Sequence, residues 1–238
     1  MRILLINPNT SVDMTERIVA QAQLHVAPDT ELVAVTAEFG CEVIASRASY
    51  AIAAHAALDV FAKHRSDVDA VVLACFGDPG LAALREIACV PVIGLLDSVL
   101  IEASRLERPF SIVTAGGIWV HMFEELVRLS AHAAMFRGVF ALDTTGIKIS
   151  RDPKSAIVDL QAAVDAATAS GSKAVVLGGA ALAGLGSRLN SSAELIDPLT
   201  AAMELAQRKD GKAHPHSGRP RIESCGLSSK LRQILADD

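Results

Sequence analysis

The 238-residue chain has few aromatic side chains and no excess of positive charge. Aromatic residues make up 4% of it, with one Trp and one Tyr, which is too few for a surface that stacks the bases of single-stranded nucleic acid. The formal net charge is -5, whereas proteins that bind nucleic acid carry a basic surface. We therefore predict no nucleic-acid partner.

The chain also lacks a long apolar run and closely spaced cysteines. No run reaches the roughly 18 residues that a membrane-spanning helix needs, and the apolar start ends at Asn7-Pro8 without a signal-peptide cleavage site. The four cysteines lie far apart with no CxxC pair, which favours reduced thiols over a disulfide framework. Hydrophobic residues are 51% and charged residues 21%, which excludes intrinsic disorder. We predict a cytoplasmic globular protein without membrane contact.

Short β-branched runs alternate with longer Ala- and Leu-rich stretches. Continuous apolar runs of this length are typical of buried parallel strands, and stretches such as 46–64 and 153–169 are typical of the helices that connect them. The predicted strands are 2–6, 31–37, 70–74, 90–93, 110–114, 134–142, 174–177 and 194–196. The polar segment 209–221 is predicted to be a loop before a last short helix from Leu227.

An internal repeat relates the two halves of the chain. Residues 70–81 align with residues 174–185, because both begin with AVVL and the Gly and Leu that follow also match. Coincidence between two α/β units is the alternative explanation. The repeat predicts an α/β fold of two pseudo-symmetric lobes, each a four-stranded, mainly parallel sheet flanked by helices. The predicted lobes are residues 1–96 with 209–238, and residues 97–208.

Four small or Gly-rich turns follow predicted strands, at residues 7–11, 75–78, 114–117 and 178–181. Ligands of open α/β sheets bind beyond the carboxyl ends of the strands. The backbone N–H groups of such turns can approach a carboxylate or carbonyl oxygen. These turns are therefore the candidate ligand site.

Cys75 is the strongest single candidate for a functional residue in these turns. It lies where the third predicted strand ends and a helix is about to begin, so peptide dipoles favour a thiolate there. The alternative is a small buried hydrophobic side chain, which is the ordinary role of a free cysteine. We assign that ordinary role to Cys41, Cys89 and Cys225.

No motif indicates a metal or a nucleotide cofactor. His214 and His216 lie in the polar loop, and no third ligand has the spacing of a metal site. The glycines near residues 77–80 and 178–179 do not make the GxGxxG spacing of a dinucleotide site. We predict neither a metal nor an organic cofactor, and a small molecule as substrate.

Several of these motifs resemble one known group. Residues 7–11 (NPNTS) and 74–81 (ACFGDPGL) resemble the hydantoin/allantoin racemase branch of the aspartate/glutamate racemase superfamily. Residues 90–94, 111–114 and 176–185 are similar to segments of that branch in the same order, and CFGDPGL is the most specific stretch. The resemblance implies an active-site cleft between two lobes, no cofactor, and two cysteines that act on opposite faces of the substrate. Relatives of this kind are often homo-oligomers, and the sequence is compatible with one.

The resemblance also implies the site residues. Cys75 would be the thiol of the first lobe, and Gly179 stands where the family has its second cysteine. The internal repeat pairs the same two positions. The residues implied to line the substrate site are Asn9, Thr10, Ser11, Phe76, Gly77, Thr114 and Ala180.

Glycine at position 179 leaves three interpretations open. The first is a racemase-type enzyme that acts on the acidic C–H next to a carbonyl of a 5-substituted hydantoin, allantoin or a related amino-acid derivative. Cys75 is then the acid/base, and water or another side chain replaces the missing thiol. The second is a one-thiol decarboxylase or isomerase similar to arylmalonate decarboxylase. The third is a relative that binds a small carboxylate or ureide without turning it over.

Overall fold

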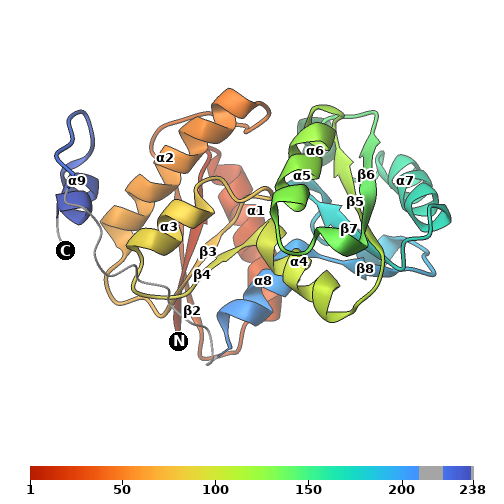
Figure 1. Cartoon of the computed structure of the whole chain (residues 1–238), viewed down its shortest axis with the longest axis horizontal. Helices are drawn as coiled ribbons and strands as arrows, with labels where there is room; N and C mark the ends of the chain where they lie inside the picture. The colour runs from red at the N-terminus through yellow and green to blue at the C-terminus, as the bar shows by residue number, and fades with distance from the viewer. Residues whose placement is uncertain (209–221, 237–238) are drawn as a thin grey trace. The chain divides into compact units, whose positions relative to one another are not determined.

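A computed structural model of the chain describes residues 1–208 and 222–236 (Figure 1). The chain forms two compact units, Met1–Gly94 with Met203–Asp238, and Leu95–Ala202. Among the described residues, every helix is too short or too polar to cross a lipid bilayer.

The first unit is built on four parallel strands. They are β1 (Arg2–Asn7), β2 (Glu31–Thr36), β3 (Ala70–Leu73) and β4 (Val92–Gly94), in the spatial order β2-β1-β3-β4. The central strands β1 and β3 are buried along almost their whole length, which explains their continuous apolar sequences. In their register Ile6 lies opposite Leu73, so the chain leaves both strands at the same edge of the sheet.

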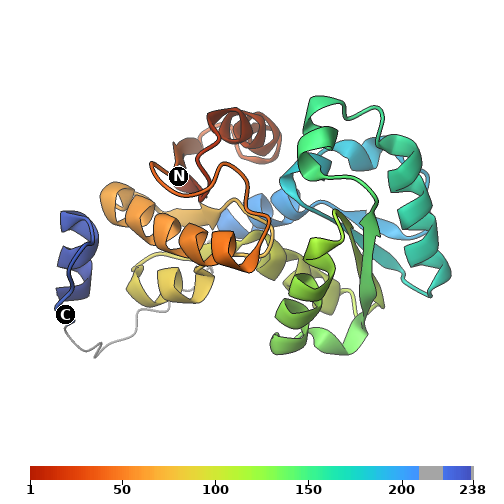
Figure 2. The same cartoon turned by 90° about the horizontal axis from the view of Figure 1, so that it is seen from above.

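Helices cover this sheet. They are α1 (Val12–Ala22) with the short 3-10 helix η1 (Gln23–His25), α2 (Arg47–His64), α3 (Leu81–Ile87) and α9 (Ser229–Ala236). The helix α2 begins at a capping box formed by Ser46 and Ser49 and buries alanines against the strands. The helix α9 packs beside the C-terminal half of α2, where Leu231 and Ile234 join its hydrophobic cluster (Figure 1, Figure 2).

The second unit repeats the arrangement. Its strands are β5 (Phe110–Ala115), β6 (Phe136–Leu142), β7 (Ala174–Gly178) and β8 (Glu194–Ile196), all parallel, in the order β6-β5-β7-β8. Thr114 lies opposite Gly178 at the ends of the central strands. Its α-helices are α4 (Leu95–Arg105), α5 (Ile118–Leu129), α6 (Gly146–Arg151), α7 (Ile157–Ala169) and α8 (Pro198–Ala206), the last continuing into the first unit. The 3-10 helices are η2 (Ala133–Met135), η3 (Ala180–Leu182) and η4 (Leu185–Arg188).

The two sheets have the same strand order, with β1 to β4 corresponding to β5 to β8. This confirms the predicted α/β fold with two four-stranded parallel sheets, and it pairs β3 with β7 as the repeat predicts. Some boundaries differ. The helix predicted from residue 153 begins at Ile157, because Ser155 donates to Asp152 O at 2.8 Å and the segment forms a local turn instead.

Candidate active site

The turn after β1 is organised around two asparagines. Asn7 is fully buried, and its Nδ2 donates to Asn9 Oδ1 and to Thr15 Oγ1, both at 2.9 Å. Asn9 Oδ1 also accepts from Ser11 N at 2.9 Å. Ser11 in turn caps α1, because its Oγ accepts from Met14 N at 3.3 Å. The sequence from Asn7 to Ser11 therefore forms a rigid strand-to-helix turn.

Two donors of this turn remain available. Asn9 Oδ1 accepts two N–H groups, so the orientation of the Asn9 amide is fixed and its Nδ2 is the free end. No hydrogen bond among the described residues involves Asn9 Nδ2 or the hydroxyl of Thr10, and both side chains are partly exposed. The turn thus offers an amide NH₂ group and a hydroxyl that can bind a carbonyl oxygen.

The turn after β3 carries Cys75. Ala74 N donates to Ile6 O at 2.8 Å, which places this turn next to the turn after β1. Two successive turns follow, because Asp78 N donates to Cys75 O at 3.0 Å and Leu81 N donates to Asp78 O at 3.1 Å. Cys75 as a whole residue is partly exposed, whereas its sulfur is buried. The ring of Phe76 is buried, so Phe76 can meet a ligand only through its backbone.

The predicted thiolate at Cys75 is wrong for the free protein. The next helix, α3, begins only at Leu81, so the helix dipole that motivated the prediction does not act at Cys75. Burial of the sulfur and, second, the carboxylate of Asp78 raise the pKa of the Cys75 thiol to about 12. Cys75 is therefore a protonated thiol at neutral pH.

Tyr50 bonds to the turn that carries Cys75, and the sequence reasoning missed this contact. Tyr50 lies on α2, and its hydroxyl donates to Gly77 O at 2.6 Å. Burial, and then the nearby Asp78 and Cys75, raise the pKa of its phenol. No spacing in the sequence links residue 50 to residue 77, and the one available signal is that Tyr50 is the sole tyrosine of the chain.

In the second unit, Thr114 and Gly178 connect the ends of the central strands. The hydroxyl of Thr114 is buried and donates to Gly178 O at 2.9 Å. Thr114 was implied to line the substrate site, but in this structure its side chain holds the turn after β7 in place. Ala180 is the first residue of η3. Among the described residues, the backbone N–H groups of Ala180 and Ala181 make no hydrogen bond, as is common at a helix start.

Gly179 has a backbone conformation that suits glycine. Its φ is 125° and its ψ is 140°, in a region that residues with a Cβ rarely adopt. A Cβ built at this position would meet nothing within 4 Å. Backbone geometry rather than lack of space therefore favours glycine here.

The sequence of the chain decides its family. A sequence model described as Asp/Glu/Hydantoin racemase matches residues 3–206. The chain belongs to the Asp/Glu/hydantoin racemase family. The hydantoin racemase of Paenarthrobacter aurescens is 33% identical over 213 residues, which cover 87% of this chain and 90% of that protein.

Solved structures agree with this assignment. The allantoin racemase from Klebsiella pneumoniae superposes with a TM-score of 0.81 at 30% identity, and the match covers 98% of each chain. Arylmalonate decarboxylase shares the fold, with a TM-score of 0.56 at 16% identity over 90% of this chain and 96% of that one. Membership of the family makes this chain a racemase-type isomerase.

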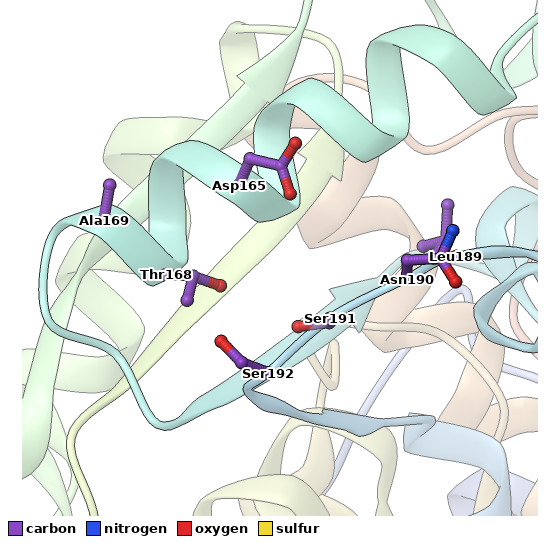
Figure 3. Close-up of a pocket in the computed structure, with 7 residues that line it drawn as sticks. All are labelled: Asp165, Thr168, Ala169, Leu189, Asn190, Ser191 and Ser192. Atoms are coloured by element: carbon purple, nitrogen blue, oxygen red, sulfur yellow. The ribbon is translucent and has the colours of Figure 1, made fainter.

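The racemase also has an open pocket in its second unit, with a volume of about 840 Å³ (Figure 3). The pocket lies between the C-terminal end of α7 and the segment that precedes β8. It is therefore at the amino-terminal edge of the sheet, whereas Gly179 follows β7 at the carboxyl edge. Gln161 Nε2 donates to Asp165 Oδ1 at 2.8 Å and to Asn190 O at 2.7 Å. Polar groups around this pocket thus bond to each other, and it is not the candidate active site.

His214 and His216 lie outside the described residues, as does the predicted loop 209–221.

Proposed function

We propose that this racemase-family enzyme moves the acidic proton next to a carbonyl group of a 5-substituted hydantoin, allantoin or a related amino-acid derivative, with Cys75 as its acid/base. The observation that carries the proposal is the position of Cys75 at the carboxyl end of β3, next to the turn that presents Asn9 and Thr10. The hydantoin racemase relative supports the substrate class. The chemistry needs no cofactor.

The first step is binding and polarisation of a carbonyl. The Asn9 NH₂ group and the Thr10 hydroxyl donate hydrogen bonds to a carbonyl oxygen of the substrate. Negative charge develops on that oxygen as the neighbouring carbon loses its proton, so these donors stabilise the transition state more than the ground state.

The second step is proton transfer to and from Cys75. The thiolate form takes the proton from carbon: the C–H bond breaks, an S–H bond forms, and the electron pair moves to the enolate oxygen. Return of a proton from the thiol to the same face of the carbon reverses each change. Because the pKa of Cys75 is raised, its thiolate is scarce at neutral pH but strongly basic.

Glycine at position 179 limits the outcome. The resemblance puts the second cysteine of the family at this position, and Gly179 has no side chain to transfer a proton. Exchange of the substrate proton by Cys75 on one face is therefore faster than inversion. Inversion is slower because water must supply the proton on the opposite face. Exchange with retention is the main expected event.

Proton NMR in deuterated water tests this proposal. Each enantiomer of 5-benzylhydantoin and of allantoin is incubated with the enzyme, and chiral chromatography follows the same samples. We expect exchange above the spontaneous rate, a loss of about 100-fold or more in Cys75→Ser, and no change in Cys89→Ser, whose cysteine is exposed. Equal exchange by the wild type and Cys75→Ser overturns the role of Cys75.

Decarboxylation is a second candidate, because Cys75 rests as a thiol and no second thiol is present at position 179. In this reaction a disubstituted malonate loses carbon dioxide, the electron pair of the broken C–C bond stays in an enolate, and the Cys75 thiol protonates the carbon. Release of carbon dioxide from phenylmalonate derivatives, without exchange of hydantoins, favours this candidate. Binding without either reaction favours a ligand-binding protein.

A further inference from the structure

A buried carboxylate stands beside Cys75 in the same turn. Asp78 is buried, with 8% of the residue exposed, and its φ of 56° lies in the left-handed region. Asp78 takes part in both turns of this segment, through its N–H to Cys75 O and its carbonyl to Leu81 N. The two residues belong to one turn, because Asp78 N donates to Cys75 O at 3.0 Å, and after burial the charge of Asp78 is the second cause that raises the pKa of the Cys75 thiol.

The surrounding elements make room for this carboxylate and fix it. A Cβ on Gly94, the last residue of β4, would lie 2.7 Å from Asp78 Oδ1 and closer still to the rest of the carboxyl group. On the other side, α2 holds the turn, because Tyr50 donates to Gly77 O and a Cβ on Gly80 would lie 3.1 Å from Ala54. The fold thus accommodates a buried carboxylate where an ordinary turn needs none.

We propose that Asp78 is a positioning residue whose buried carboxylate, held in the same turn as Cys75, makes the Cys75 thiolate a stronger base toward the substrate proton. This inference rests on the proposed role of Cys75. The titratable groups coupled to the Cys75 sulfur are Asp78 of its own turn and Tyr50 of α2. The Tyr50 hydroxyl donates its hydrogen to Gly77 O, so it stays a neutral phenol, and Asp78 supplies the negative charge.

The proton balance follows from this arrangement. In the Cys75 thiolate, the negative charge of the sulfur lies in the same turn as the Asp78 carboxylate. Two like charges at close range repel, which makes the thiolate a stronger base. The thiolate takes the proton from the substrate carbon: the C–H bond breaks, an S–H bond forms, and the electron pair moves to the enolate oxygen. Return of a proton from sulfur to the same carbon reverses each change. Without the carboxylate, the thiolate is more stable and less basic.

Alkylation of the free protein by iodoacetamide tests the inference without any substrate. Peptide mass spectrometry measures the rate at Cys75 as a function of pH, with Cys89 in the same sample as a reference for the reagent. Asp78→Asn removes the charge and keeps a residue that tolerates a positive φ. We expect Cys75 in this variant to be alkylated about tenfold faster or more at pH 8. Glu86→Gln removes an exposed charge from α3 and is expected to leave the rate unchanged.

Tyr50→Phe separates charge from loosening of the turn. It breaks the hydrogen bond to Gly77 O and leaves the carboxylate in place. We expect a smaller increase in alkylation than in Asp78→Asn. An unchanged rate in Asp78→Asn, or an equal increase in Tyr50→Phe, overturns the inference.

The pH profile of substrate exchange adds a readout that a structural role would not move. In Asp78→Asn the profile should shift to lower pH, and the rate reached at high pH should fall. A profile that does not shift overturns the inference. Failure of the wild type to exchange hydantoins overturns the proposed function instead, while the alkylation result still decides the effect of Asp78 on Cys75.

Discussion

Replacement of Gly179 by alanine adds a Cβ where the backbone has a φ of 125°. The added atom meets nothing within 4 Å, so crowding contributes no cost. The cost is that of holding a residue with a Cβ in a backbone region used almost solely by glycine, which is about 1–3 kcal/mol. For a chain of this size, about 2–4 °C per kcal/mol gives a fall in Tm of roughly 2–12 °C.

Gly146→Ala is the matched control for this substitution. Gly146 begins α6 without a positive φ, and its added Cβ would lie 3.6 Å from Ala181, an ordinary contact with the same η3 segment. Because alanine restricts the unfolded chain and favours a helix, we expect a gain of about 0.4–1 kcal/mol. Urea unfolding and calorimetry of both variants measure the two changes. Equal stability of Gly179→Ala and the wild type refutes the argument from φ.

Three further predictions concern the Cys75 thiol, the glycine at position 179 and the C-terminal helix α9. The rate of C5 proton exchange should rise about tenfold per pH unit above neutrality. The reason is that the thiolate fraction grows until the pH reaches the raised pKa of Cys75, about 12. A plateau near pH 8 in the exchange assay would contradict this prediction. Gly179→Cys should increase inversion relative to exchange by about tenfold or more by supplying a second thiol, as chiral chromatography would measure, despite the backbone cost given above. Burial raises the pKa of Asp59, but hydrogen bonds from Lys63 and Ser228 lower it on balance. The ionised carboxylate therefore stabilises the fold at a pH above its unfolded-state pKa. This stabilisation is lost as the pH falls through the lower folded-state pKa. Asp59→Asn should therefore cost about 1–3 kcal/mol in urea unfolding at pH 7 and speed amide exchange in α9, whereas Asp159→Asn, at an exposed position of α7, should not.

The sequence was sufficient for the strands and for the place of the thiol. Buried parallel strands need apolar side chains on both faces, so runs such as residues 70–73 stand out without any knowledge of their neighbours. Residues that follow such strands come together at one edge of the sheet, and this rule locates Cys75 and the turn after β1.

The pKa shifts of the candidate site could not be predicted from the sequence. The pKa of Cys75 depends on its burial and on the direction in which Asp78 points, and the latter depends on a glycine in β4. The Asp-Pro-Gly sequence indicated a turn, which is correct, but not that its carboxylate is buried. The backbone of Gly179 is likewise set by how β7 ends. The cytoplasmic location and the homo-oligomer stay predictions.

The division of the chain has a consequence for its synthesis. The second unit is a continuous segment, Leu95–Ala202, whereas the first unit needs both Met1–Gly94 and residues from Met203 onward. On the ribosome, the second unit can therefore complete its core while the first still lacks α9. Until that helix emerges, the cluster that Leu231 and Ile234 complete stays open to water along α2. The nascent first unit is then the part of the chain that chaperones are expected to recognise.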